Sequence, residues 1–147
     1  MSQEAAGSVP GVMRLELTTP DRRAVELEVT EVIVPGSEGV FTVLYDHTPL
    51  LSILDVGVLY AGDVQGQGHF FAVHGGFAEI SDNNILVMAQ AAEESAEIEL
   101  ERAESARERA ERRLNARGES EDIDLARAEL ALRRAVSRIQ AHGHVVF

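Results

Sequence analysis

The arginines of this chain gather in its C-terminal part and are spaced to hold an anion. All 13 basic residues are arginine, and ten of them follow residue 92. Arg102 and Arg109 are seven positions apart and Arg134 and Arg138 are four apart, so each pair would share one face of a helix. Four guanidinium groups, each a planar fork of donors, suit a triphosphate. The alternative is that these arginines pair with neighbouring glutamates on solvated helix faces.

Three histidines in the first part of the chain suggest a second kind of chemistry. His47, His69 and His74, with Glu79 nearby, could be the ligands of a metal in a small β-domain enzyme. The close-spaced pair of ligands on one strand that such sites use is missing, and isolated histidines more often pack or lie exposed. We therefore expect no metal, and a metal-dependent enzyme stays an alternative.

Other catalytic chemistry is limited by residue types that the chain lacks. The absence of cysteine excludes disulfides, thiolate metal sites and cysteine nucleophiles. The absence of lysine excludes a Schiff base and a lysine-dependent phosphate loop. The serines have no histidine and acid at a recognisable spacing. We therefore expect no catalytic residues.

The chain is acidic, and its charge is unevenly shared. Its net charge is −12; residues 1–92 hold 12 acids and 3 arginines, whereas residues 93–147 hold 13 acids and 10 arginines. An acidic chain repels phosphate backbones, so we expect no nucleic-acid partner. The sequence has no apolar run of about eighteen residues and no signal peptide, so we expect a cytosolic protein without direct insertion into lipid.

The first 92 residues alternate turn signals with runs of strand length. Residues 13–17 alternate apolar with polar side chains, as a half-buried strand does. Later runs are rich in β-branched and aromatic residues, and Gly75-Gly76 between two of them indicates a turn or bulge. The pattern predicts an antiparallel β-sandwich of about eight to ten strands over residues 12–91. Its core is expected to include four aromatic residues: Phe41, Phe70, Phe71 and Phe77.

From Ala91 onward the apolar period becomes that of a helix. One alanine-rich stripe runs through residues 96–114 and a second apolar stripe runs through residues 125–139. The short link between them predicts an antiparallel two-helix hairpin over residues 93–140, so the fold class is α+β.

The hairpin is also predicted to be a moving part. Ser120, Asp122 or Asp124 could cap its second helix. Alanine lets the two backbones approach closely, but each alanine buries little surface and holds the pair weakly. Helix formation is therefore favoured, whereas docking of the helices is the weaker link.

The order of several short strings carries a resemblance. Four of them follow one another along the chain: Pro35-Gly36-Ser37-Glu38-Gly39-Val40-Phe41, His47-Thr48-Pro49-Leu50-Leu51, Ala72-Val73-His74-Gly75-Gly76-Phe77 and Ala91-Ala92-Glu93. Over residues 12–140 the chain resembles the epsilon subunit of F-type ATP synthases. It departs from that family at Thr42, where glycine is usual, and at Tyr45-Asp46, where Pro-Gly is usual.

The resemblance implies a non-catalytic subunit of the rotor's central stalk, peripheral to the cytoplasmic face of the cell membrane. In this family the sandwich touches the gamma subunit and the membrane rotor ring, the c-ring. The hairpin either folds down on the sandwich or extends toward the catalytic alpha and beta subunits and blocks ATP hydrolysis. We expect Ser37 and Glu38, with His47 nearby, to form the ring contact. A coiled-coil adaptor unconnected with any rotary machine is a further alternative.

The resemblance also implies a nucleotide site. In some members the folded hairpin binds ATP through an Ile/Leu-Asp-x-x-Arg-Ala string, which here reads Ile98-Glu99-Leu100-Glu101-Arg102-Ala103, with glutamate in place of the aspartate. Carried over position by position, the family's nucleotide contacts fall on six residues: Glu93, Glu99, Arg102, Arg109, Arg134 and Arg138. The expectation is no cofactor, with ATP as a candidate regulatory ligand.

Overall fold

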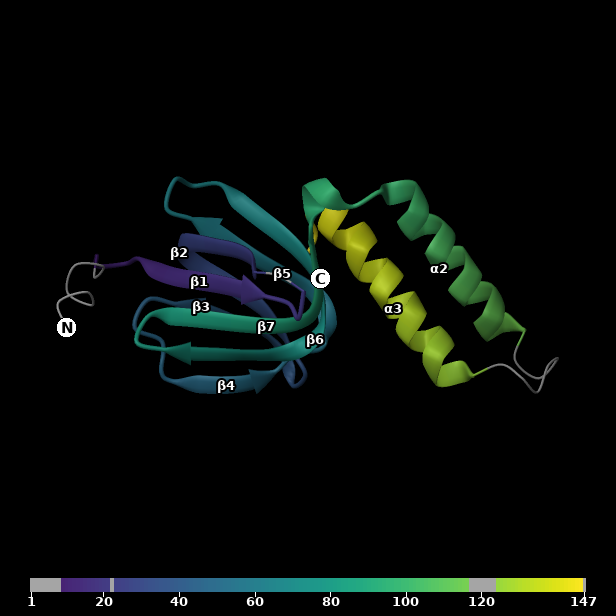
Figure 1. Ribbon diagram of the computed structural model, residues 1–147, viewed down its shortest axis with the longest axis horizontal. Coiled ribbons are helices and arrows are strands. Elements are labelled where there is room, and N and C mark those ends of the chain that lie inside the picture. Colours follow the sequence, from purple (N-terminus) through teal and green to yellow (C-terminus); the bar gives the residue numbers. More distant parts are fainter. Residues whose placement is uncertain (1–8, 22, 117–123, 147) are drawn as a thin grey trace.

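The chain forms a β domain with a helical hairpin attached at one end (Figure 1), in a computed structural model that describes residues 9–21, 23–116 and 124–146. Within these residues it has seven strands, one short 3-10 helix and two α-helices. Their bounds are β1 (Met13–Thr18), β2 (Arg23–Gly36), β3 (Gly39–Leu44), β4 (Leu50–Ile53), β5 (Val56–Asp63), β6 (Gly68–Ser81), β7 (Asn84–Glu94), η1 (Ser95–Glu97), α2 (Leu100–Asn115) and α3 (Leu125–His142).

Five of the strands close on themselves. β1 pairs with both β7 and β2, which completes the order β1-β7-β6-β5-β2. β3 adds to β2, and β4 adds to β6. The β1–β7 pair is parallel, and the other strand pairs of the described chain are antiparallel. The predicted α+β fold, a β-sandwich followed by a two-helix hairpin, is confirmed, with this one parallel pair in addition.

The described chain has seven strands where we expected eight to ten, because two strands are long. β2 and β6 each run for 14 residues. β6 crosses Gly75-Gly76 without a shift of register on β7, since His74 faces Ala91 and Gly76 faces Ala89. The glycine pair is therefore part of a strand rather than a turn or bulge.

The glycine pair nevertheless has a structural role. Gly75 and Gly76 have φ angles of 72° and 105°, which disfavour residues with a Cβ. A Cβ on Gly76 would lie 2.0 Å from the carbonyl oxygen of Met88. β6 changes partner at this point, from β5 at His74 to β4 at Phe77. Only glycine therefore allows β6 to bend here while it stays paired.

The core of the β domain lies between its two layers of strands. Met13, Leu15 and Leu17 on β1 are buried and alternate with more exposed residues, as the sequence predicts. Of the four aromatic residues expected in the core, Phe71 is fully buried, and Phe41 is partly buried and packs against the core cluster. The expectation is wrong for Phe77, which is 41% exposed. It is also wrong for Phe70, which packs against the hairpin instead.

The two helices pack through alanines, as predicted. Ala103 and Ala110 of α2 are buried, as are Ala128 and Ala135 of α3. The first helix is shorter than expected, because residues 95–97 form the separate turn η1.

The start of the second helix has the predicted kind of cap. The side chain of Asp124 accepts a hydrogen bond from the backbone N–H of Arg127 at 3.2 Å. The other candidates, Ser120 and Asp122, lie outside the described residues.

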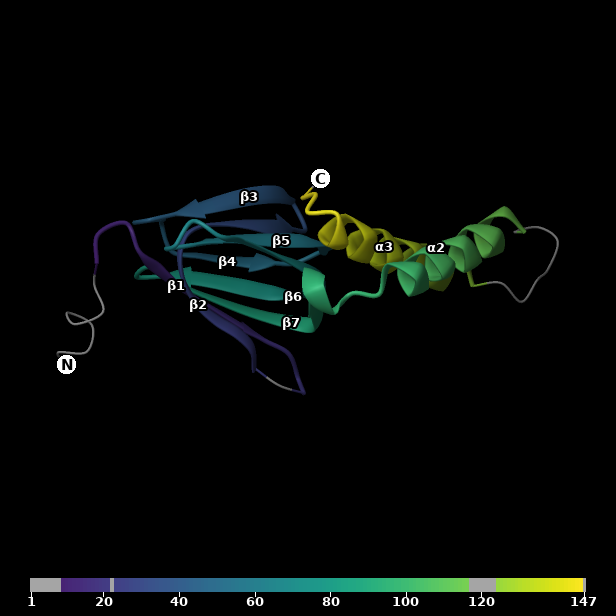
Figure 2. The same ribbon diagram turned by 90° about the horizontal axis from the view of Figure 1, so that it is seen from above.

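The hairpin meets the β domain at one end only. α3 packs on β5 and β6 through its C-terminal half, whereas α2 packs mainly against α3. Figure 2 shows both helices leading away from the sandwich, with their linked ends farthest from it. None of the helices in the described part of the chain is long and apolar enough to cross a membrane. β7 ends at Glu94, and the domain boundary between residues 91 and 93 stays a prediction.

Candidate functional site

A cavity of about 610 Å³ lies between the end of β7 and the base of the hairpin. Five of the six residues of the expected nucleotide site line it: Glu93, Glu99, Arg102, Arg109 and Arg138. They come from three elements, because Glu93 lies near the end of β7, Arg102 on α2 and Arg138 on α3. The fold therefore assembles most of the predicted set, although whether a nucleotide binds there stays a prediction.

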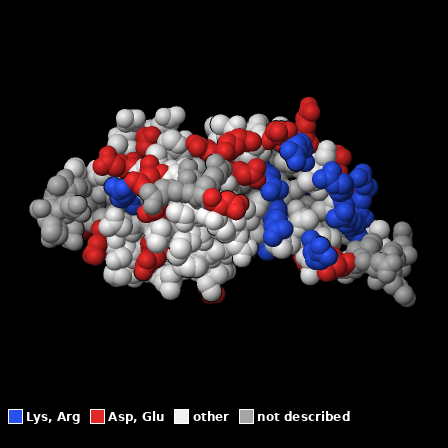
Figure 3. All heavy atoms as spheres, viewed as in Figure 1, with Lys and Arg blue, Asp and Glu red and all other residues white. Residues whose placement is uncertain are grey.

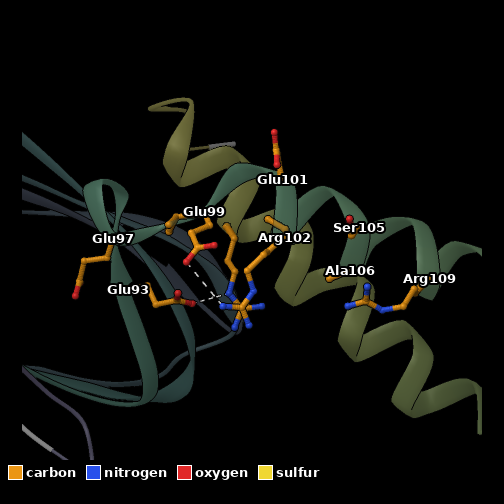
Figure 4. Close-up of a pocket in the computed structure, with 11 residues that line it drawn as sticks. Glu93, Glu97, Glu99, Glu101, Arg102, Ser105, Ala106 and Arg109 are labelled. Atoms are coloured by element: carbon orange, nitrogen blue, oxygen red, sulfur yellow. Dashed lines mark hydrogen bonds and ion pairs between the residues drawn. The ribbon is translucent and has the colours of Figure 1, made fainter.

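Two ion pairs lie in this cavity. Arg138 donates from Nε to Oε1 of Glu93 at 2.5 Å, and both side chains are about two-thirds buried. Nη1 of Arg102 lies 3.9 Å from Oε1 of Glu99, and this pair is largely exposed. Figure 4 shows Arg102 pointing toward Glu93 and Glu99, whereas Arg109 stands farther along α2. An anion entering the cavity would compete with these carboxylates.

Six cavity residues lie outside the predicted set, and three of them are polar. Glu97, Glu101 and Ser105 also line the cavity. Figure 4 shows Glu97 and Glu101 pointing away from its centre. Of these three residues, only Ser105 could have been assigned to the cavity from the sequence. It lies one helical turn after Arg102 and one before Arg109, on the same face of the helix.

The structure places Arg134 elsewhere. Arg134 does not line the cavity, and its charge instead acts on His74 of β6. Its carbonyl oxygen accepts a hydrogen bond from Ser137 Oγ at 2.8 Å. The expected facing of Arg134 and Arg138 into one site is therefore wrong for Arg134, because the face of α3 that carries both residues is divided between the cavity and β6.

A buried polar contact joins α3 to the sandwich. His74 is 4% exposed, and its Nε2 lies 3.2 Å from Oγ of Ser137, which is 2% exposed. Burial lowers the pKa of His74 to about 4, and the charges of Arg138 and Arg134 add to this against the opposing effect of Glu93. His74 is therefore neutral at pH 7. No local sequence pattern indicates that Ser137 is buried, because two of its neighbours one helical turn away are Arg133 and Arg134.

The rest of the docking surface is small. Val58, Ala72, Ile98 and Ala141 form a buried cluster, with Phe70 packed against them. The ring of Phe70 stacks on His144, with centroids 4.7 Å apart and planes within 5°. Toward the other end of β5, Arg133 of α3 pairs with Asp55, and this hydrogen bond lowers the pKa of Asp55.

The three histidines of the metal-site alternative lie apart. His69 is paired with Asp63 and Glu94, His74 faces α3, and His47 lies in the turn after β3. Among the described residues, no group of three or more His, Asp or Glu side chains could hold a metal ion. The structure does not bring these residues together as that alternative requires.

The expected ring-contact residues lie in two different turns. Ser37 and Glu38 are exposed in the turn between β2 and β3, and Ser37 donates its N–H to the carbonyl of Ile53 at 2.8 Å. His47 follows the other end of β3, about 17 Å away for a strand of this length. The expectation that His47 is near Ser37 and Glu38 is wrong, because β3 is extended rather than part of one loop.

One face of the β domain exposes apolar side chains. Leu51 and Ile53 of β4 are each 68% exposed, and Phe77 lies beside them on β6. A neighbouring groove of about 710 Å³ includes Ile53, Phe77 and Met88. Contiguous exposed apolar surface of this kind is typical of a protein contact. Figure 3 shows by contrast that arginines gather over the helices.

Comparisons with known proteins agree with this architecture. The family described as "ATP synthase, Delta/Epsilon chain, beta-sandwich domain" matches residues 12–95, and its "long alpha-helix domain" matches residues 96–143. The chain is 45% identical over 102 residues to the ATP synthase epsilon chain of Nitratidesulfovibrio vulgaris (strain DP4), covering 69% of this chain and 75% of that one. It is 43% identical over 107 residues to that of Desulforamulus reducens, covering 71% and 79%.

A solved structure shares the fold. A chain in the mitochondrial ATP synthase of Euglena gracilis superposes with a TM-score of 0.78 at 24% identity, covering 94% of this chain and 85% of that one. At this identity the likeness concerns the fold alone. The family matches together span both the sandwich and the hairpin. The chain therefore belongs to the family of ATP synthase delta and epsilon chains, as an epsilon chain, a non-catalytic subunit of the rotary ATP synthase.

Proposed function

We propose that this chain works in the central stalk of an F-type ATP synthase, as a peripheral subunit at the cytoplasmic face of the membrane. The β domain couples the gamma subunit to the c-ring, and the hairpin regulates ATP hydrolysis by the alpha and beta subunits. Family membership supports the stalk role. The exposed apolar face around Leu51, Ile53 and Phe77 supports a stable protein partner such as gamma.

The observation that carries the regulatory part is the one-ended docking of the hairpin. Its apolar contact with the sandwich is a cluster of four buried residues with Phe70 packed against them, in which only Val58, Ile98 and Phe70 are large. Two polar contacts accompany it, His74–Ser137 and Glu93–Arg138. Burying one such side chain is worth about 1.5–3 kcal/mol. The exposed pair Arg133–Asp55 adds at most about 1 kcal/mol. A few kcal/mol from a competing surface would therefore be enough to detach the helices.

A removable cross-link tests this regulation. The chain has no cysteine, so Asp55→Cys with Arg133→Cys can be joined by a cleavable bismaleimide in the assembled enzyme. We expect hydrolysis to rise when the hairpin is locked down and to fall again when the link is cleaved, with each single-cysteine variant unaffected. Identical hydrolysis by the locked and cleaved enzymes under every condition would contradict the proposal.

The c-ring contact is proposed for the exposed turn at Ser37 and Glu38. This turn also borders Asp55, because Asp55 donates its N–H to Pro35, so the ring would lie near the base of the hairpin. Cross-linking from Glu38→Cys to the ring should succeed, whereas Thr48→Cys, next to His47 at the far end of β3, should not. Efficient cross-linking from Thr48→Cys alone would place the contact at the other end.

We further propose that the cavity holds the triphosphate of ATP. Phosphate oxygens accept the same hydrogen bonds as carboxylates, so ATP would take Arg138 from Glu93 and Arg102 from Glu99. Calorimetric titration of the isolated chain should detect binding. Arg138→Gln should weaken it by about tenfold or more, because a charge-assisted hydrogen bond is worth about 1.5–3 kcal/mol. Arg127→Gln, outside the cavity, is the matched control. Absence of heat at millimolar ATP would exclude the site.

A further inference from the structure

His69 lies between two carboxylates at the root of the hairpin. Its Nε2 is 2.9 Å from Oδ2 of Asp63, at the end of β5, and its Nδ1 is 3.3 Å from Oε2 of Glu94, the last residue of β7. The His69 and Asp63 side chains are 18% and 11% exposed. Three strands are thus joined through one imidazole ring.

This geometry requires a charged ring. An ionised carboxylate only accepts hydrogen bonds, so both contacts form only when both ring nitrogens carry a proton. Asp63 is held in place, because its Oδ1 accepts the backbone N–H groups of Gln65 and Gln67 at 2.8 and 2.9 Å. Glu94 is the more exposed partner, with a side chain 37% exposed, and it also accepts the backbone N–H of Glu97 in the capping box of η1. A neutral ring can donate to only one of the two, and Glu94 is the one that would be lost.

Glu94 is also the point where the hairpin begins. Its backbone N–H donates to the side chain of Glu97 at 3.0 Å, which closes the turn η1. Ile98 directly follows and is 6% exposed in the cluster with Val58 and Ala141 that holds α3 to the sandwich. The position of Glu94 therefore fixes the direction in which the chain leaves β7 for the helices.

We propose that His69 is a pH-responsive clamp on the root of the hairpin: the imidazolium holds Glu94 and favours the docked helices, and loss of its proton releases Glu94 and favours detachment. The clamp rests on the proposed regulation by detachment of the hairpin and names a residue that would control it. It adds a sensor that acts without nucleotide, at a residue outside the cavity.

The electrostatics give the sign of the response. Partial burial disfavours the charged ring, but the hydrogen bonds and charges of Asp63 and Glu94 outweigh it and raise the pKa of His69 above 6.5. Detachment removes Glu94 but leaves Asp63, so the pKa of His69 is higher in the docked state than in the detached state. Docking is therefore supported while the ring is charged, and it loses this support as pH rises through the docked pKa. The other titratable groups here are Glu97, bound to the N–H of Glu94, and His144, stacked on the adjacent Phe70.

Energy transfer between labels on the isolated chain tests the clamp. Glu79→Cys on β6 and Glu129→Cys on α3 provide exposed label sites in a chain without native cysteine. From about pH 6 to about pH 9 the ratio of detached to docked hairpin should rise, by up to tenfold for each pH unit by which docking raises the pKa of His69. His69→Gln should abolish this rise, and His47→Gln should keep it.

A second variant distinguishes loss of the clamp from misfolding of the His69→Gln chain. Glu94→Gln removes one carboxylate, and the response should then move to lower pH, together with the titration of the His69 ring followed by NMR. The clamp is refuted if the label distance changes on acidification to about pH 5 but not between about pH 6 and about pH 9. No change at any pH refutes the detachable hairpin as well.

Discussion

Acid should release the hairpin through His74. In the docked state the pKa of His74 is about 4, against 6.5 for an exposed histidine. A depressed histidine pKa leaves docking unaffected above pH 6.5 and weakens it as pH falls toward 4, because only the detached state takes up the proton easily. At about 1.4 kcal/mol per pH unit, the loss is about 2 kcal/mol at pH 5 and at most about 3.5 kcal/mol well below pH 4.

The same labelled chain measures this loss. The ratio of detached to docked hairpin should rise about thirtyfold between pH 7 and pH 5, which corresponds to the 2 kcal/mol above. His74→Gln keeps a partner for Ser137 but cannot titrate, so its ratio should stay nearly constant over this range. His47→Gln, in the turn after β3 where the ring contacts the carbonyl of Thr48, should behave like the unmodified chain.

The reasoning fails if His74→Gln detaches with the same pH dependence as the unmodified chain. Another group would then govern the acid response. It also fails if NMR titration of the docked chain gives His74 an ordinary pKa. In that case water or a rearranged Ser137 would have to solvate the ring, and the burial of His74 at 4% exposure would not describe the docked state in solution.

Three further predictions concern the stability of the fold. Gly76→Ala should lower the free energy of unfolding by more than about 2 kcal/mol in urea, because the new Cβ meets the carbonyl of Met88 and φ is positive; a loss under about 0.5 kcal/mol would contradict the bend in β6. Phe71→Ala should cost about 3–5 kcal/mol, whereas Phe77→Ala, at 41% exposure, should cost less than about 1 kcal/mol, and equal costs would contradict the assigned core. Asp124→Ala should destabilise α3 by about 1 kcal/mol in thermal melts followed by circular dichroism, and Asp124→Asn should restore most of it.

The parts of the fold that follow from local pattern were predictable from sequence. The alternation at Met13, Leu15 and Leu17 and the alanine stripes of the helices are set by residues close in the chain. The continuity of β6 was not predictable, because a glycine pair is an ordinary turn signal. The pairing of β6 with β7, which brings Met88 close to Gly76, shows that β6 stays paired there.

The residues of the candidate site were likewise predictable only in part. The spacing of Arg102 and Arg109 on one helix face follows from sequence, and both line the cavity. Arg134 and Arg138 are equally well spaced, yet they separate, because α3 is turned so that its face is shared between the cavity and β6. The rotation of a docked helix depends on its partner surface. His74 and Ser137, which fix it here, give no local signal.

Two histidines on β6 respond to pH in opposite directions at the base of one hairpin. Protonation of His74 opposes docking, because it places a buried charge beside Arg134 and Arg138. Deprotonation of His69 opposes docking, because Glu94 loses its donor. Docking should therefore be strongest in a pH window between the two pKa values. Since the apolar contact is worth only a few kcal/mol, either edge of this window can decide whether the helices stay on the sandwich.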